Sequence, residues 1–182
     1  MKTFKKLFAL ILALMMSLSL FACDSKKDDG DKGEKGENSA ASTNSAEGAL
    51  KAHFKALEKA DADAYIDVMP EHQKLFYDYE SIEENVEENI SERLSYFEDV
   101  YGENIKFNIN INEVKDLKQK ALNEIKEYYA SEDINYIEIE EGKEIEFDLT
   151  IKGASGEDVS TSNATVIKEN GEWKVWSIDS AF

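Results

Sequence analysis

Few side chains in this sequence could act as nucleophiles or as metal ligands. There is one cysteine, Cys23, and there are two histidines, His53 and His72. A zinc site needs several Cys or His ligands at close spacing, and a catalytic hydroxyl or thiol needs a base beside it. Neither histidine has helical spacing to the other or adjoins the cysteine, and no G-x-S-x-G or phosphate-binding glycine loop occurs. The sequence therefore predicts no metal site, no cofactor and no catalytic centre defined by a motif.

His53 adjoins an apolar stripe at helical spacing, formed by Leu50, Phe54 and Leu57. A histidine in this position is more often a partly buried structural residue than a general base. We therefore interpret His53 as part of the packing of the domain.

The segment that ends at Cys23 has the composition of an export signal. Three lysines precede an apolar run from Leu7 to Ala22 that only two serines interrupt. This run is short of the ~20 residues that a membrane-spanning helix needs, and a polar tract follows it. We therefore expect residues 1–22 to be a cleaved signal peptide.

The residues Leu20-Phe21-Ala22-Cys23 resemble the lipobox of bacterial lipoproteins, with a leucine three positions before the cysteine and a small residue directly before it. The resemblance implies that Cys23 receives a thioether-linked diacylglycerol and becomes the first mature residue. Two acyl chains are enough for stable anchoring. The implied location is the extracytoplasmic face of the cell membrane, with the membrane contacted through the acyl chains on Cys23.

The charge of the chain excludes one class of partner. The formal net charge is −18, and it becomes −21 when residues 1–22 are removed, because three lysines and no acids are lost. Nucleic-acid binding requires a basic face, so we expect no nucleic-acid partner. Anionic lipid head groups would also repel this protein. Attachment to a membrane must then come from the acyl chains.

Residues 23–45 are expected to form the lipidated cysteine and a disordered polar tether. Asp24 to Asn44 contains no aliphatic residue larger than alanine and no aromatic residue. Such a segment cannot contribute to an apolar core. A flexible coil of ~20 residues spans about 25 Å, which would lift a folded domain of residues 46–182 away from the head groups.

The first part of that domain has helical periodicity. Ser45 is expected to cap a first helix, and Asp61 or Asp63 a short second helix. A third helical region, from Leu75 to Tyr101, has apolar residues at steps of three or four and includes Leu75 and Tyr79. Ser81-x-x-Glu84 predicts a capping box that divides this region, and Gly102 is expected to end it.

After Gly102 the apolar period becomes alternating, which is typical of strands with one wet face. We expect a strand near residues 105–112 and then a helix capped by Asp116-x-x-Gln119. An antiparallel meander follows. Its expected strands are residues 134–140, 144–152, 158–168 and 172–179, with a turn at Glu141-Gly142 and a type I′ turn at Asn170-Gly171.

Helices followed by a meander that ends in Gly171-Glu-Trp173-Lys-Val175-Trp176 resemble the NTF2-like, or cystatin-like, fold. The predicted fold class is α+β, with N-terminal helices packed on a curved antiparallel sheet. The resemblance implies a pocket between the sheet and the helices. The candidates for this pocket are aromatic, sulfur-containing and acidic: Tyr65, Met69, Tyr128, Trp173 and Asp179.

The resemblance leaves two functional classes open, because a fold does not fix an activity. We expect a non-catalytic binding or accessory module whose partner is a small ligand or another envelope protein. The alternative is an NTF2-like isomerase or dehydratase that uses a base and a tyrosine in the pocket.

The last strand suggests where a partner could bind. Trp173 and Val175 should point to one face, and Trp176 and Ile178 to the other. We expect Trp176, with Trp173 and Tyr65, to mark a ligand or partner contact, unless a helix or Ala181-Phe182 covers Trp176. The outward residues of two other strands are polar throughout, which disfavours a broad sheet-to-sheet dimer. We therefore expect a monomer.

Overall fold

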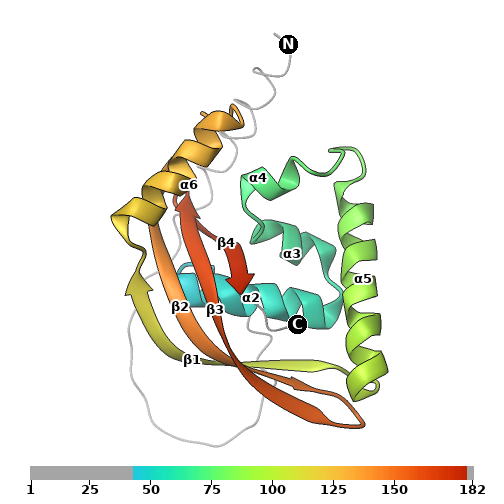
Figure 1. The fold of residues 1–182 in the computed structure, drawn as a ribbon. Helices are drawn as coiled ribbons and strands as arrows, with labels where there is room; N and C mark the ends of the chain where they lie inside the picture. The colour runs from blue at the N-terminus through green and yellow to red at the C-terminus, as the bar shows by residue number, and fades with distance from the viewer. Residues whose placement is uncertain (1–42, 180–182) are drawn as a thin grey trace, which may run out of the picture. The chain divides into compact units, whose positions relative to one another are not determined.

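The computed structural model describes residues 43–179. The elements in chain order are α2 (Ala46–Lys59), α3 (Ala62–Asp67), α4 (Glu71–Lys74), α5 (Ile82–Tyr101), β1 (Lys106–Asp116), α6 (Gln119–Ser131), β2 (Ile139–Lys152), β3 (Glu157–Glu169) and β4 (Glu172–Asp179). The strands form one antiparallel sheet in the order β1-β2-β3-β4 (Figure 1). The predicted α+β class is confirmed. Cys23, most of the expected tether and Ala181-Phe182 lie outside the described residues.

The sheet separates two apolar clusters. The larger cluster joins buried residues of α2, α3 and α5 to inward residues of all four strands, among them Phe147 and Val166. The smaller cluster joins α6 to the opposite face of the sheet, through Ile125 and Ile167. Val166 and Ile167 are consecutive, and successive strand residues point to opposite faces. Figure 1 accordingly shows α6 on one side of the strands and α2, α3 and α5 on the other.

Three of the predicted helix ends are confirmed. Ser45 caps α2, because its Oγ accepts a hydrogen bond from the Gly48 amide at 3.0 Å. Asp61 caps α3 in the same way, through the Ala64 amide at 3.0 Å. Gly102 follows α5 with a φ of +82°, a region that glycine enters without strain. These caps satisfy backbone donors that a helix end would otherwise leave unpaired.

Both predicted capping boxes are wrong. Ser81 does precede α5, but its side chain accepts from Asn85 Nδ2 at 2.8 Å and makes no cap hydrogen bond to the helix backbone. Asp116 belongs to strand β1 and pairs with Lys143, and α6 begins after Lys118. In each case a competing partner takes the side-chain oxygen that the motif requires.

The meander contains one long strand where two were predicted. Strand β2 runs without interruption from Ile139 to Lys152, so the expected turn at Glu141-Gly142 is wrong. A register shift between Ile139 and Gly142 absorbs the local irregularity. Gly142 sits at this position because Leu117 packs against it; an added Cβ would lie 2.9 Å from Leu117 Cδ2. Ile134 is buried in the loop that precedes β2.

The segment between α4 and α5 also differs from the prediction. Leu75 and Tyr79 were expected in an apolar helical stripe, yet they lie in turns and expose 53% and 84% of their surface. Phe76 beside them exposes 77%. The hairpin at Asn170-Gly171 is confirmed, since both residues have positive φ (49° and 88°), as a type I′ turn requires.

Both edges of the sheet are tied to the helices. At the β4 edge the Val175 amide donates to the Val68 carbonyl at 2.8 Å, and Lys174 Nζ donates to the Asp67 carbonyl at 2.6 Å. At the β1 edge the Phe107 amide donates to Glu58 Oε2 at 3.3 Å. Helix α2 and the α3–α4 segment are thereby fixed against opposite edges of the same sheet.

Candidate functional site

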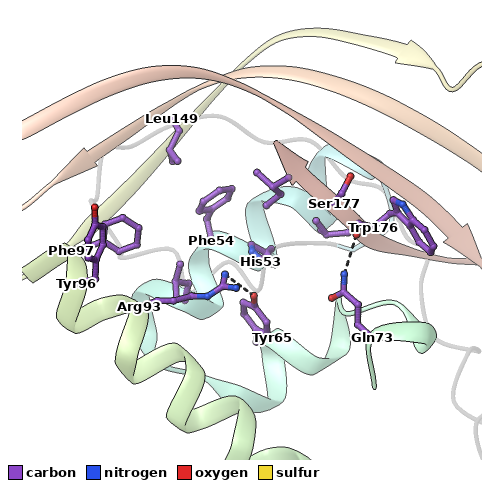
Figure 2. A pocket seen from close by; sticks show the side chains of 13 residues that line it. His53, Phe54, Tyr65, Gln73, Arg93, Tyr96, Phe97, Leu149, Trp176 and Ser177 are labelled. Atoms are coloured by element: carbon purple, nitrogen blue, oxygen red, sulfur yellow. Dashed lines mark hydrogen bonds between the residues drawn. The ribbon is translucent and has the colours of Figure 1, made fainter. Parts of the chain in front are cut away.

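A cavity of about 430 Å³ opens between the larger helical layer and the sheet. Helix α2 supplies one wall, α3 and α5 the facing wall, and strands β2 and β4 the roof (Figure 2). Most of the lining is apolar or aromatic. The groups that could bind a polar ligand are few: His53, Tyr65, Gln73, Arg93, Tyr96 and Ser177.

His53 forms part of the cavity wall as a neutral ring. Its imidazole lies against Tyr65, with ring centroids 4.6 Å apart, and against Phe54 at 5.3 Å. Burial, together with the nearby Arg93 charge, lowers the pKa of His53 to about 3. A base with so low a pKa accepts protons poorly at neutral pH. The ring can still donate one hydrogen bond and accept another.

Arg93 contributes the only positive charge of the cavity lining. Its guanidinium donates a hydrogen bond to the Tyr65 hydroxyl at 3.4 Å (Figure 2). Tyr65 itself is buried, which raises the pKa of its phenol, while the Arg93 charge acts in the opposite direction. Arg93 is exposed to solvent, so it lies at the mouth of the cavity and Tyr65 lies deeper.

Strand β4, which lines the cavity, contains a β-bulge. Thr165 pairs with Ser177 and Val166 with Val175, so Trp176 has no partner in the ladder. Because of this bulge, Ile178 packs with the larger cluster and Trp176 with the smaller one. The prediction that both residues share a face is therefore wrong. Gln73 Nε2 holds the bulge in place by donating to the Trp176 carbonyl at 3.0 Å.

Helix α6 and the α4 region cover much of Trp176. Its indole lies 4.0 Å from the His72 ring and 5.8 Å from the rings of Tyr128 and Tyr129, measured between centroids. Helix α6 therefore packs on the face of β4 that carries Trp176. The sequence had left open whether this face is covered or forms an exposed contact. Trp176 is also among the residues that line the main cavity and among those that line a shallower hollow of about 330 Å³ beside α6.

The other residues predicted for the pocket are dispersed. Met69 and Trp173 are buried in the larger cluster, Tyr128 borders the shallower hollow, and Asp179 is exposed at the end of β4. Of that set only Tyr65 lines the main cavity. Gln73, Arg93 and Ser177 were not predicted as site residues from the sequence. Arg93 carried a usable signal, since it is the only arginine of the chain and has Ile90, Tyr96 and Phe97 at helical spacing.

The buried carboxylate of the described domain lies outside this cavity. Glu169 accepts hydrogen bonds from the Tyr129 hydroxyl and from the Glu71 amide, the latter at 3.1 Å. Burial raises the pKa of Glu169, and the hydrogen bond from Tyr129 counteracts that effect. No carboxylate lines the main cavity, so an acid–base pair of the isomerase type has no Asp or Glu there.

Within residues 43–179, no group of three or more His, Cys, Asp or Glu side chains could hold a metal ion. Over the same range no helix is long and apolar enough to cross a membrane. The chain matches no protein-family model, and no curated protein resembles it significantly in sequence.

Proposed function

We propose that this protein is a membrane-anchored, extracytoplasmic lipoprotein whose NTF2-like domain binds a small ligand and does not catalyse a reaction. The observation that carries the binding role is the cavity of about 430 Å³ between sheet and helices. Small-molecule sites in proteins occupy roughly 300–1,000 Å³ and combine an apolar lining with a few polar groups. The lining described above has this composition.

The architecture supports the NTF2-like assignment. Helices come first, an antiparallel sheet follows, and the cavity lies between them. The roof and walls belong to different elements, so the cavity depends on the packing of the whole domain. A binding site of this kind needs no motif, which fits a sequence in which no catalytic motif is found.

The anchor supports the location. The lipobox-like residues before Cys23 and the net negative charge of the chain favour attachment through acyl chains over attachment through a basic surface. A domain carried on such a tether would meet ligands in the space outside the membrane.

The cavity can be tested with the uncharged dye Nile red, whose emission shifts to the blue in an apolar site. We expect one dye molecule to bind per protein. Leu57→Trp replaces a buried side chain of the cavity wall with a much larger aromatic one and should abolish binding; circular dichroism checks that the variant is folded. Lys120→Trp is the matched control, because it adds the same ring at a side chain that is 89% exposed on α6. If the wild type shows no saturable binding, or if Leu57→Trp binds as well as the wild type, the cavity is not a binding site.

A further inference from the structure

We propose that the cavity selects a small organic monocarboxylate, whose carboxylate group binds at Arg93 and Tyr65 and whose apolar body enters the aromatic interior. This inference rests on the binding role proposed above and names the class of ligand. Arg93 carries a positive charge that no acidic side chain of the described domain pairs with.

Among the described residues Arg93 has no acidic ion-pair partner, although the chain as a whole is strongly acidic. The ion pairs of the described residues involve lysines throughout, and none includes Arg93. Helix α5 is rich in glutamate, but the residues three and four positions from Arg93 are Asn89, Ile90, Tyr96 and Phe97. The usual helical salt bridge is therefore not possible at this position. Its guanidinium is left with the Tyr65 hydroxyl as its hydrogen-bond acceptor.

The groups around Arg93 are suited to a carboxylate. Guanidinium presents parallel N–H donors that match the two oxygens of one carboxylate. The Tyr65 hydroxyl accepts from Arg93 and so keeps its own proton free to donate toward the cavity. His53 is neutral, as its lowered pKa of about 3 requires, so one of its ring nitrogens carries a proton that can be donated. No carboxylate of the lining competes for these donors.

The apolar walls define the rest of the ligand. Phe54, Leu57, Phe97 and Leu149 line the interior beyond the polar groups. Burial of an apolar body against these side chains would stabilise the complex by about 25 cal/mol for each Å² removed from water. A ligand with a charged head and an apolar body satisfies both parts of the cavity.

The charge of the protein limits the head group to a single negative charge. The whole chain carries −18, so anions are repelled at long range and must be held by local contacts. One guanidinium can neutralise one carboxylate. A dianionic phosphate would need a second cation, and Arg93 is the only Lys or Arg that lines the cavity.

The experiment is a titration of the full-length protein with three probes of the same shape: 4-phenylbutyrate, its uncharged amide, and phenylpropyl phosphate. Binding is followed by the fluorescence of tryptophan, because Trp176 lines the cavity. We expect the carboxylate to bind about five- to tenfold more tightly than the amide. A charge-assisted hydrogen bond is stronger than a neutral one, but solvent weakens it here because Arg93 is exposed. Arg93→Gln should abolish this preference, because the affinity for the carboxylate falls to about that for the amide.

The controls separate this inference from the binding role itself. Lys120→Gln removes one positive charge from α6, outside the cavity, and should keep the preference for the carboxylate. Equal binding of the carboxylate and the amide by the wild type would overturn the inference while the binding role stands. Tighter binding of the phosphate would overturn the choice of a monocarboxylate. If none of the three probes binds at millimolar concentration, the monocarboxylate inference fails, and the binding role then stands or falls with the Nile red titration.

Discussion

Tyr129 on helix α6 donates a hydrogen bond from its phenol to the carboxylate of Glu169 at the end of strand β3, in the interior of the domain. The second oxygen of Glu169 accepts from the Glu71 amide, which begins helix α4. A single carboxylate thus joins α6, β3 and α4. A buried carboxylate is costly unless it is hydrogen-bonded, so this arrangement makes the Tyr129 hydroxyl important for stability.

Removal of that hydroxyl should destabilise the fold. Tyr129→Phe takes away one of the two hydrogen bonds to Glu169 and leaves a buried oxygen without a donor. We expect the free energy of unfolding to fall by about 1–3 kcal/mol, measured by denaturant unfolding. Tyr128→Phe is the matched control, because the neighbouring Tyr128 hydroxyl makes no hydrogen bond within the described domain, and its loss should change stability by less than about 0.5 kcal/mol. Equal effects of the two variants would contradict this account.

The carboxylate of Glu169 should also make stability depend on pH. Burial raises the pKa of Glu169 above its ordinary value of 4.5, so the folded state keeps the proton to higher pH than the unfolded state. Stability therefore falls as the pH rises from 4.5 through the folded pKa, and the cost is fully present above it. Glu169→Gln does not titrate. Between pH 4 and pH 7 we expect the wild type to lose stability relative to this variant, and a constant difference between their unfolding midpoints would refute the shift.

The histidines should remain neutral in the folded protein over the whole range from pH 5 to pH 8. Burial lowers the pKa of His72 to about 4, and burial together with Arg93 lowers the pKa of His53 to about 3. Because both folded pKa values lie below the ordinary value of 6.5, protonation favours the unfolded state. The contribution of the neutral histidines to the free energy of unfolding is therefore complete above pH 6.5 and is lost as the pH falls through the folded pKa values of about 4 and 3. NMR titration of the imidazole protons measures this directly. A ring that titrates near 6.5 in the folded state, as it should in urea, would show that it is not buried as described.

Two glycines of one loop should respond differently to a methyl group. A Cβ on Gly153 would clash with the carbonyl oxygen of Tyr101 and would lie 2.6 Å from that of Gly102, and both are backbone atoms. We expect Gly153→Ala to destabilise the domain by about 2 kcal/mol or more, because the backbone must shift. A Cβ on Gly156 would meet nothing within 4 Å, so Gly156→Ala should be neutral or slightly stabilising. Thermal unfolding of the two variants measures the contrast; similar midpoints would mean that the loop is not packed against the end of α5.

The proposed anchor depends on one side chain. Cys23→Ala removes the only thiol of the chain, so the protein should incorporate no labelled fatty acid when it is produced in bacteria. The wild type should be labelled and should sediment with membranes, since two acyl chains anchor stably. Equal labelling of the two proteins would refute the lipobox interpretation.

Local signals in the sequence were sufficient for some of the fold. Ser45, Asp61 and the Asn170-Gly171 turn were predicted correctly because each makes its hydrogen bonds, or sets its backbone angles, within a few residues of itself. Gly142 was misread as a turn because the reason for that glycine is Leu117, which packs against it from the segment before α6. The capping boxes failed for a related reason: Ser81 and Asp116 had other partners within reach.

The candidate site could be predicted only in part. Tyr65 was expected at the pocket and lines the cavity. Trp176 was expected at a ligand or partner contact, and it is also among the lining residues. The pairing of Arg93 with Tyr65 was not foreseen, because it joins residues 28 positions apart on two helices whose packing no local pattern specifies. The bulge at Trp176 could not be predicted from the sequence either. Strict alternation along β4 places the side chains of Trp176 and Ile178 on the same face, and only the register with β3 shows that they lie on opposite faces.

The hydrogen bonds at the two edges of the sheet affect how copies of this protein can associate. A strand at the edge of a sheet offers unpaired amides to any neighbouring chain, which is a common route to aggregation. Here the Phe107 amide on β1 is already bound by Glu58, and the Val175 amide on β4 by the Val68 carbonyl. A second copy that added a strand at either edge would have to displace one of these contacts. With the proposed lipid anchor, copies of the protein would be confined to one surface and would meet often. The two hydrogen bonds would then oppose the extension of the sheet from one molecule into the next.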